Sequence, residues 1–167
     1  MNPVKVLVIF ILGLILQLTI ADKVAIAGAK PDFLIVILVA LALNRNVIAA
    51  VIIGFFLGFL QDLASPAFLG MNAFAKSLIA YGIARIGGEY LPHNILYFIA
   101  LIFSAVLIND IISLNVVYSF SFTNVLGSFF RYSLLTAVYS ALLGGVLYIL
   151  VFGLGMIGVV RQRSRIE

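Results

Sequence analysis

The chain has 167 residues, of which 65% are hydrophobic and only 10% are charged, and its formal net charge is +4. Soluble domains carry about a quarter of charged residues, so this composition excludes an ordinary water-soluble protein and indicates a membrane protein. Cysteine is absent, which excludes disulfides, thiolate metal sites and cysteine nucleophiles. Several apolar runs exclude a cleaved signal peptide or a single anchor as the explanation.

A helix needs roughly 20 apolar residues to cross about 30 Å of hydrocarbon. On this measure the sequence predicts an all-α bundle of six transmembrane helices, forming one membrane domain over residues 1–167. In chain order the six segments are 4–21, 33–43, 47–61, 68–86, 95–112 and 132–160. The second has only 11 uninterrupted apolar residues, which leaves open a five-span bundle in which that segment is re-entrant.

Basic residues predict the orientation of the six segments. With both termini in the cytoplasm, six basic residues lie inside and three outside, as the positive-inside rule requires. The inner six are Lys5, Arg45, Arg85, Arg161, Arg163 and Arg165, and the outer three are Lys23, Lys30 and Arg131. A basic tail beside an apolar helix is typical of contact with anionic lipid, and we expect no nucleic-acid partner.

Glycines in the third segment predict a close helix–helix contact. Gly54, Gly58 and Asp62 recur every four residues, so they lie along one stripe of the helix. Small residues at this spacing let another helix backbone approach, which is how helices associate in lipid. The spacing leaves open whether the neighbour belongs to this chain or to another protein.

Asp62 follows Asn46 by 16 residues, roughly 24 Å of helix rise, and should lie near the outer membrane boundary. A charge is tolerated there if it caps the start of the fourth helix or pairs with a cation. Lys76, about a turn and a half beyond Gly70 and on the same helix face as Asn72, is the candidate cation.

Other polar residues lie inside the apolar segments. Asp110, next to Asn109 in the outer third of the fifth segment, is either a proton or ligand site or a structural group satisfied by a neighbouring helix end. Gln17 is interpreted as a hydrogen-bonding link between helices. His93 is the only histidine, so a histidine metal site has no second ligand, and we expect no metal or other cofactor.

The connection over 113–131 is the longest one predicted, and it is rich in Phe, Tyr and Val. Within it, YSFSFT at 118–123 alternates apolar and polar residues, which is typical of a strand or of a surface half-sunk in the membrane interface. This segment is a candidate docking face. The sequence has no arranged nucleophile and base and no glycine-rich phosphate loop, so we predict no enzyme.

The run GFFLGFLQDLASPAFLGMNAFAKSLIAYGIARI at 54–86 resembles the MreD family of bacterial rod-shape-determining membrane proteins. The pattern is a glycine stripe, a Gln-Asp pair, a polar turn, a Leu-Gly pair, an Asn and a Gly-x-x-Arg step. Here these are Gly54, Gly58, Gln61, Asp62, Leu69, Gly70, Asn72, Gly82 and Arg85. The last segment, RYSLLTAVYSALLGGVLYIL, also resembles the family's last helix. Lys76 is a departure, since the family's fourth helix is usually apolar there.

The resemblance implies a non-enzymatic scaffold in the bacterial inner membrane, part of the elongasome. Such a scaffold binds the bitopic protein MreC and links the MreB filament to peptidoglycan synthesis by a RodA-type polymerase and a class B penicillin-binding protein. In this hypothesis the glycine stripe and the fourth helix pack against a partner's transmembrane helix. The family is also similar in fold to the S-components of energy-coupling-factor transporters. The alternative is therefore a transporter subunit that binds a small molecule or lipid in a pocket lined by Asp62, Asn72, Lys76 and Asp110.

Overall fold

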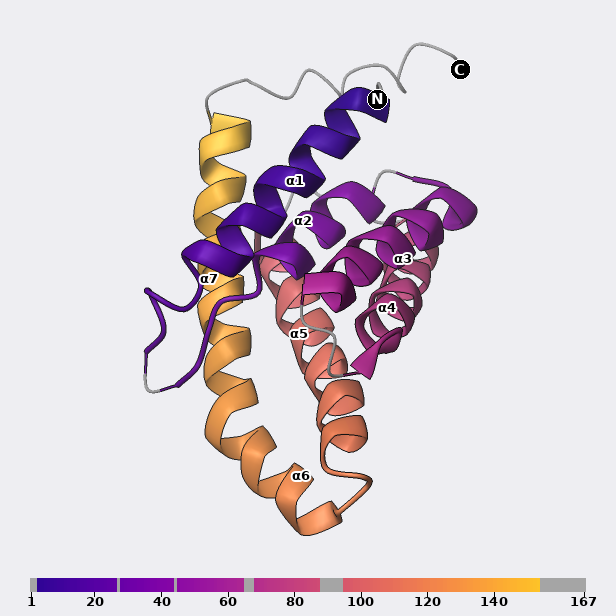
Figure 1. Cartoon of the computed structure of the whole chain (residues 1–167). Coiled ribbons are helices and arrows are strands. Elements are labelled where there is room, and N and C mark those ends of the chain that lie inside the picture. Colours follow the sequence, from indigo (N-terminus) through magenta and orange to yellow (C-terminus); the bar gives the residue numbers. More distant parts are fainter. Residues whose placement is uncertain (1–2, 27, 44, 65–67, 88–94, 154–167) are drawn as a thin grey trace.

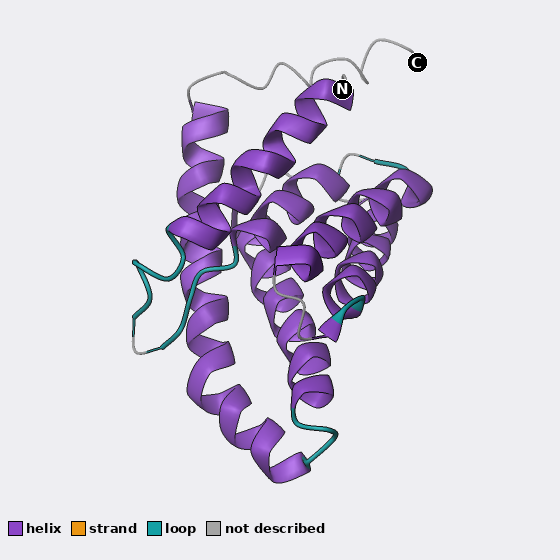
Figure 2. Ribbon diagram, in the orientation of Figure 1, coloured by secondary structure: helices purple, strands orange, loops and turns teal. Residues whose placement is uncertain are grey.

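The computed structural model describes residues 3–26, 28–43, 45–64, 68–87 and 95–153 of the chain. In order, these contain α1 (Pro3–Thr19), α2 (Phe33–Ala42), α3 (Val47–Ala64), α4 (Met71–Gly87), α5 (Ile95–Val117), α6 (Phe122–Ser128), the π-helical segment η2 (Phe129–Ser133) and α7 (Leu134–Gly153). Figure 2 shows helices and loops almost throughout, so the predicted all-α bundle is confirmed. His93 and the three tail arginines lie outside the described residues.

Each of the six predicted segments is a helix, but the helices differ in length. α3, α5 and the continuous helical run Phe122–Ile149 are long and apolar enough to cross a membrane. α1 and α2 are shorter apolar helices. The 10 residues of α2 rise only about 15 Å, half the thickness of the hydrocarbon layer. Length and composition therefore support three crossings, and the full number of six stays a prediction.

The short helix α2 lies in the centre of the bundle. Six of its ten residues are buried, and it contacts α1, α3, α4, α5 and α7. Its sequence FLIVILVALA is apolar on every face, and such a helix is stable when other elements enclose it. The carboxylate of Asp32 caps its first turn, because Asp32 Oδ1 accepts a hydrogen bond from the Ile35 amide at 2.9 Å.

The predicted long connection over 113–131 is wrong, because helices extend into it from both sides. α5 continues five residues past its predicted end, and the next helix begins ten residues before the predicted start. Between them the chain reverses at Ser119 and Phe120, whose φ angles are +49° and +61°. Their amides donate to carbonyls of the last turn of α5 at 3.2 and 2.8 Å, the pattern of a Schellman helix end. The alternation at 118–123 therefore marks a helix end and not a strand.

Figure 1 shows how the helices are arranged. α3 and α4 form a hairpin that packs beside α2 and α5, whereas α5 and α7 form the longest pair and are joined by α6. The first turn of α1 and the last turn of α7 lie at one end of the bundle, and α6 lies at the opposite end. At that opposite end the α5–α6–α7 pair extends beyond α3 and α4.

Candidate functional site

Asp62 lies in the last turn of α3 and caps the start of α4. Its side chain is fully buried, and its two carboxylate oxygens accept four hydrogen bonds. The donors are the amides of Gly70, Asn72 and Ala73, at 3.0, 3.1 and 3.0 Å, and the side-chain amide of Asn72, at 2.9 Å. The first amides of a helix have no partner within the helix, and the negative charge also suits the helix dipole. The predicted capping role is confirmed.

Gly70 completes this cap through its backbone conformation. Its φ angle is +93°, which residues with a side chain rarely adopt, although nothing lies within 4 Å of where its Cβ would be. The turn directs the Gly70 amide toward Asp62. This glycine therefore shapes the cap and contributes no ligand group.

The glycine stripe is an internal interface. Gly54 and Gly58 are buried against α4 of the same chain. A Cβ on Gly58 would overlap the carbonyl of Asn72, and one on Gly54 would overlap the carbonyl of Lys76 and lie 2.9 Å from Ala80 Cβ. The expectation that this stripe meets a partner's helix is corrected, because the α4 backbone already occupies the space.

Lys76 is fully buried, and its partners are not the ones expected. Its Nζ lies 3.7 Å from Asp32 Oδ2 at the start of α2 and donates to Asn109 Oδ1 of α5 at 3.4 Å. The predicted Asp62–Lys76 pair is wrong. Asp62 is already saturated by donors from the first turn of α4, and Lys76 lies one turn further along that helix.

The start of α2 is also tied to α1 and α7. Gln17 of α1 accepts a hydrogen bond from the Phe33 amide at 2.8 Å and donates to the Pro31 carbonyl at 3.3 Å. The Asp32 amide donates to the hydroxyl of Ser140 on α7 at 2.9 Å. Gln17 therefore links two helices, as predicted. The last turn of α1, the start of α2 and the middle of α7 are joined at one point.

Asp110 reaches the same region from α5. It is half-buried, and its carboxyl group lies close enough to Ser133, Asp32 and Lys76 to interact with them electrostatically. Ser133 is buried and belongs to the π-helical segment η2. Single π-helical turns often occur at functional sites, because the wider turn redirects a side chain. Both interpretations of Asp110, a proton or ligand site and a structural group satisfied by a neighbouring helix end, stay predictions.

We call Asp32, Lys76, Asn109, Asp110, Ser133 and Ser140 the polar cluster. It joins α2, α4, α5, η2 and α7. The sequence did not single out Asp32, because a carboxylate at a helix boundary is common. It did not single out Ser133 and Ser140 either, because an isolated serine in an apolar helix does not by itself indicate a functional site. Within the described chain, no three His, Cys, Asp or Glu residues are grouped to hold a metal ion.

The predicted pocket residues have their observed contacts in two different places. Asp62 and Asn72 belong to the cap of α4, whereas Lys76 and Asp110 belong to the polar cluster. The cap saturates Asp62 with four donors, so it has no free carboxylate oxygen directed at a ligand. The four residues therefore fall into two hydrogen-bonded groups, and a pocket that they line together stays a prediction.

Replacing Asp62 by alanine should cost about 3 kcal/mol of unfolding free energy, because three backbone amides lose a buried acceptor. SDS titration of the purified protein, followed by circular dichroism, measures the loss. Asn46→Ala is the matched control, since Asn46 accepts from the Ala49 amide at 2.8 Å in an exposed cap. We expect about 1 kcal/mol there. Equal losses in the two variants would contradict a buried cap at Asp62.

These features define a helical membrane protein whose buried polar side chains join helices to one another. The chain belongs to the MreD family: a family model described as rod shape-determining protein MreD matches residues 2–157, nearly the whole chain. Membership places the protein in rod-shape determination and among the membrane-bound rod-shape machinery. Comparison with curated proteins gave no match, and comparison with solved structures gave none either.

Proposed function

We propose that the protein is a non-enzymatic scaffold of the elongasome in the bacterial inner membrane. It binds an MreC-like bitopic protein and through it connects the MreB filament to a RodA-type polymerase and a class B penicillin-binding protein. The observation that carries this proposal is the family match over residues 2–157. The polar residues add support, because Asp62, Gln17 and Lys76 are engaged with other helices of this chain.

The partner surface lies at the α6 end of the bundle. The helical run Phe122–Ile149 has 28 residues, so it is about 42 Å long and exceeds the roughly 30 Å of hydrocarbon. A run of this length either tilts or extends past the hydrocarbon at one end, and we place its first turns at the outer membrane boundary. Phe122 and Phe130 lie in these turns with 75% and 62% of their surface exposed. Exposed apolar side chains of this kind mark protein-binding or membrane-interaction surfaces, and we assign these two to the partner.

We place both termini in the cytoplasm. The first turn of α1 and the last turn of α7 lie at the same end of the bundle, which agrees with this placement (Figure 1). The basic tail favours the cytoplasmic side for that end. The α6 end, with Phe122 and Phe130, then faces the periplasm.

Co-purification in detergent tests the scaffold role and its surface together. Phe122→Ala with Phe130→Ala should lower recovery of an MreC-like partner at least tenfold. The control is Leu142→Ala with Ile149→Ala, two α7 side chains with 60% and 59% exposure that lie outside the proposed surface. Loss of rod shape on depletion is expected in cells. Normal cell shape after depletion would contradict the cellular role. Equal recovery of the MreC-like partner with both double variants would show that the partner binds another surface.

A transporter subunit that binds a small molecule is the second candidate. It is favoured by the polar cluster, since ionisable side chains buried in a membrane protein mark ligand sites by default. Native mass spectrometry of the purified protein tests it. A vitamin bound one to one would support the S-component-like function, and a bundle without such a ligand would remove it.

A further inference from the structure

The buried face of α7 does not continue into α6. It begins at Ser133 and recurs at the helical period. Its further members are Ala137, Ser140, Ala141 and Gly144. In an uninterrupted α-helix this face would extend backwards through the side chains 3, 7 and 11 positions before Ser133, which are Phe130, Leu126 and Phe122.

The structure turns these three side chains outward instead. Phe122, Leu126 and Phe130 are 75%, 43% and 62% exposed. The residues one position earlier are half-buried in their place, namely Ser121, Val125 and Phe129. The inward face is therefore displaced by one residue between α7 and α6.

The π-helical turn η2 accounts for this displacement. Hydrogen bonds in a π turn span five residues where those of an α-helix span four, so the turn Phe129–Ser133 holds one extra residue. One residue corresponds to about 100° of rotation around a helix. The π turn thus rotates α6 by about 100° relative to α7. Single π turns are rare and are frequently found at functional sites.

Contacts with α5 hold α6 in the rotated position. Ser133, at the end of η2, is buried and lies close enough to Asp110 of α5 to interact with it electrostatically. At the end of α6, the hydroxyl of Ser128 donates to the hydroxyl of Tyr118, the residue that follows α5, at 2.9 Å. An α-helical η2 would rotate Ser128 away from Tyr118.

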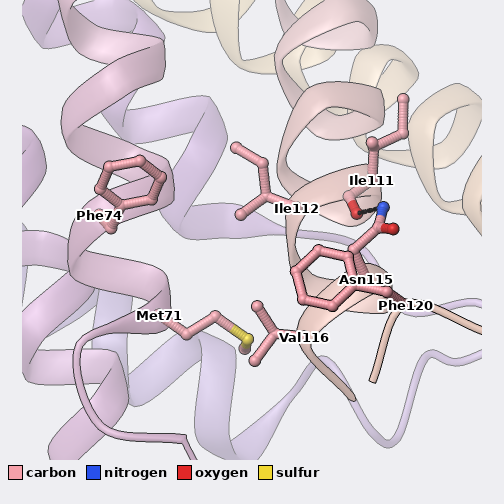
Figure 3. Close-up of a pocket in the computed structure, with 7 residues that line it drawn as sticks. All are labelled: Met71, Phe74, Ile111, Ile112, Asn115, Val116 and Phe120. Carbon is pink, nitrogen blue, oxygen red and sulfur yellow. Dashed lines mark hydrogen bonds between the residues drawn. The ribbon is translucent and has the colours of Figure 1, made fainter. Parts of the chain in front are cut away.

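The turn after α5 fixes the start of α6. Figure 3 shows Phe120 next to Ile112 and Val116 of α5, with which it lines an apolar groove. The last turns of α5 are held in turn, because the side-chain amide nitrogen of Asn115 donates to the Ile111 carbonyl at 2.8 Å (Figure 3). Both ends of the α6–η2 run are therefore anchored on α5, and η2 accommodates the extra residue between them.

We propose that η2 is the element that presents Phe122, Leu126 and Phe130 to the partner protein. It sets a fixed rotation between α7, which packs inside the bundle, and α6, which carries the partner surface. The inference rests on the proposed function, since the surface that η2 orients is the one assigned there to an MreC-like partner. The rotation itself can be measured without the partner, so failure of the inference and failure of the proposed function are distinguishable.

Cysteine labelling measures the rotation directly, because the chain contains no cysteine. Val125→Cys and Leu126→Cys are each purified in detergent as full-length protein and reacted with a water-soluble maleimide. We expect Leu126→Cys to react at least fivefold faster, because Leu126 points outward and Val125 is half-buried. In an uninterrupted α-helix the order would be reversed. Equal rates or the reverse order would overturn the proposal.

Length changes of one residue separate a π turn from an ordinary helix. Deletion of Arg131, an exposed residue of η2, removes the extra residue, so the turn becomes α-helical and Leu126 keeps its direction. Insertion of one alanine after Arg131 rotates Leu126 by about 100° toward the inward face. We therefore expect the labelling order to be kept after deletion and reversed after insertion. An ordinary α-helix would rotate in both cases, and that result would overturn the proposal.

Co-purification then tests whether the rotation matters for binding. The deletion variant should recover the MreC-like partner within twofold of the unchanged protein, and the insertion variant at least tenfold less. Arg131→Ala is the control for loss of the side chain and should also stay within twofold. SDS titration confirms that each variant is folded. Equal recovery with the deletion and insertion variants would overturn the proposal. If the unchanged protein recovers no partner, the proposed function fails, and the labelling order still decides the rotation.

Discussion

Replacing Lys76 by methionine should destabilise the protein by about 3–5 kcal/mol, the usual cost of removing one partner of a buried ion pair. Lys76 has no exposed surface, and its ammonium lies 3.7 Å from Asp32 Oδ2. Methionine fills a similar volume but leaves the carboxylate of Asp32 without a cation at the start of α2. SDS titration and thermal melting in detergent measure the loss.

A double-mutant cycle with Asp32→Asn tests whether the charge pair is the cause. The Asp32→Asn, Lys76→Met double variant should recover about 2 kcal/mol relative to the sum of the single losses. Strictly additive losses would show that the two charges do not interact. Lys30→Met is the control, because Lys30 pairs with Asp22 while both side chains are more than half exposed. We expect it to cost less than about 1 kcal/mol.

Replacing Gly58 by leucine should prevent α3 and α4 from packing and abolish the native fold. Even a single added carbon would overlap the Asn72 carbonyl and approach Ala73 Cα to 2.5 Å, and a backbone cannot rotate out of the way as a side chain can. Gly58→Ala should therefore cost about 3 kcal/mol, at the upper end for an overpacked core. Size-exclusion chromatography and SDS titration follow both variants.

Gly82 provides a control at which the same substitution should change the unfolding free energy in the opposite direction. It lies inside α4, and nothing stands within 4 Å of where its Cβ would be. Gly82→Ala should raise the unfolding free energy by up to about 1 kcal/mol, because alanine favours the helix. If Gly58→Ala were as well tolerated as Gly82→Ala, the internal role of the glycine stripe would be refuted.

Several features could be predicted from single residues and their neighbours in the chain. Six apolar runs between short polar breaks predicted six helices, since a membrane leaves a polypeptide few ways to satisfy its backbone. The four-residue spacing of Gly54 and Gly58 predicted a close helix contact, and the position of Asp62 at a helix end predicted a cap. These rest on periodicity and helix geometry, which act over a few residues.

The partner of each polar residue could not be predicted in this way. Lys76 was expected at Asp62, 14 positions away in the chain, but lies against Asp32, 44 positions away, and Asn109, 33 positions away. Likewise Asp32 meets Ser140 across 108 positions. Such contacts depend on how whole helices cross, which the spacing of residues within one helix does not specify.

By itself, the sequence determined that this protein is a helical membrane bundle with one glycine-lined contact and a capped fourth helix. Hydrophobicity and helical period are local properties of the chain, and they are sufficient to predict these three features. Only the tertiary structure decided that α4 of the same chain fills the stripe, that a ten-residue helix lies in the centre, and that Lys76 meets Asp32. Each of these depends on the space left between helices, and that space exists only after they have packed.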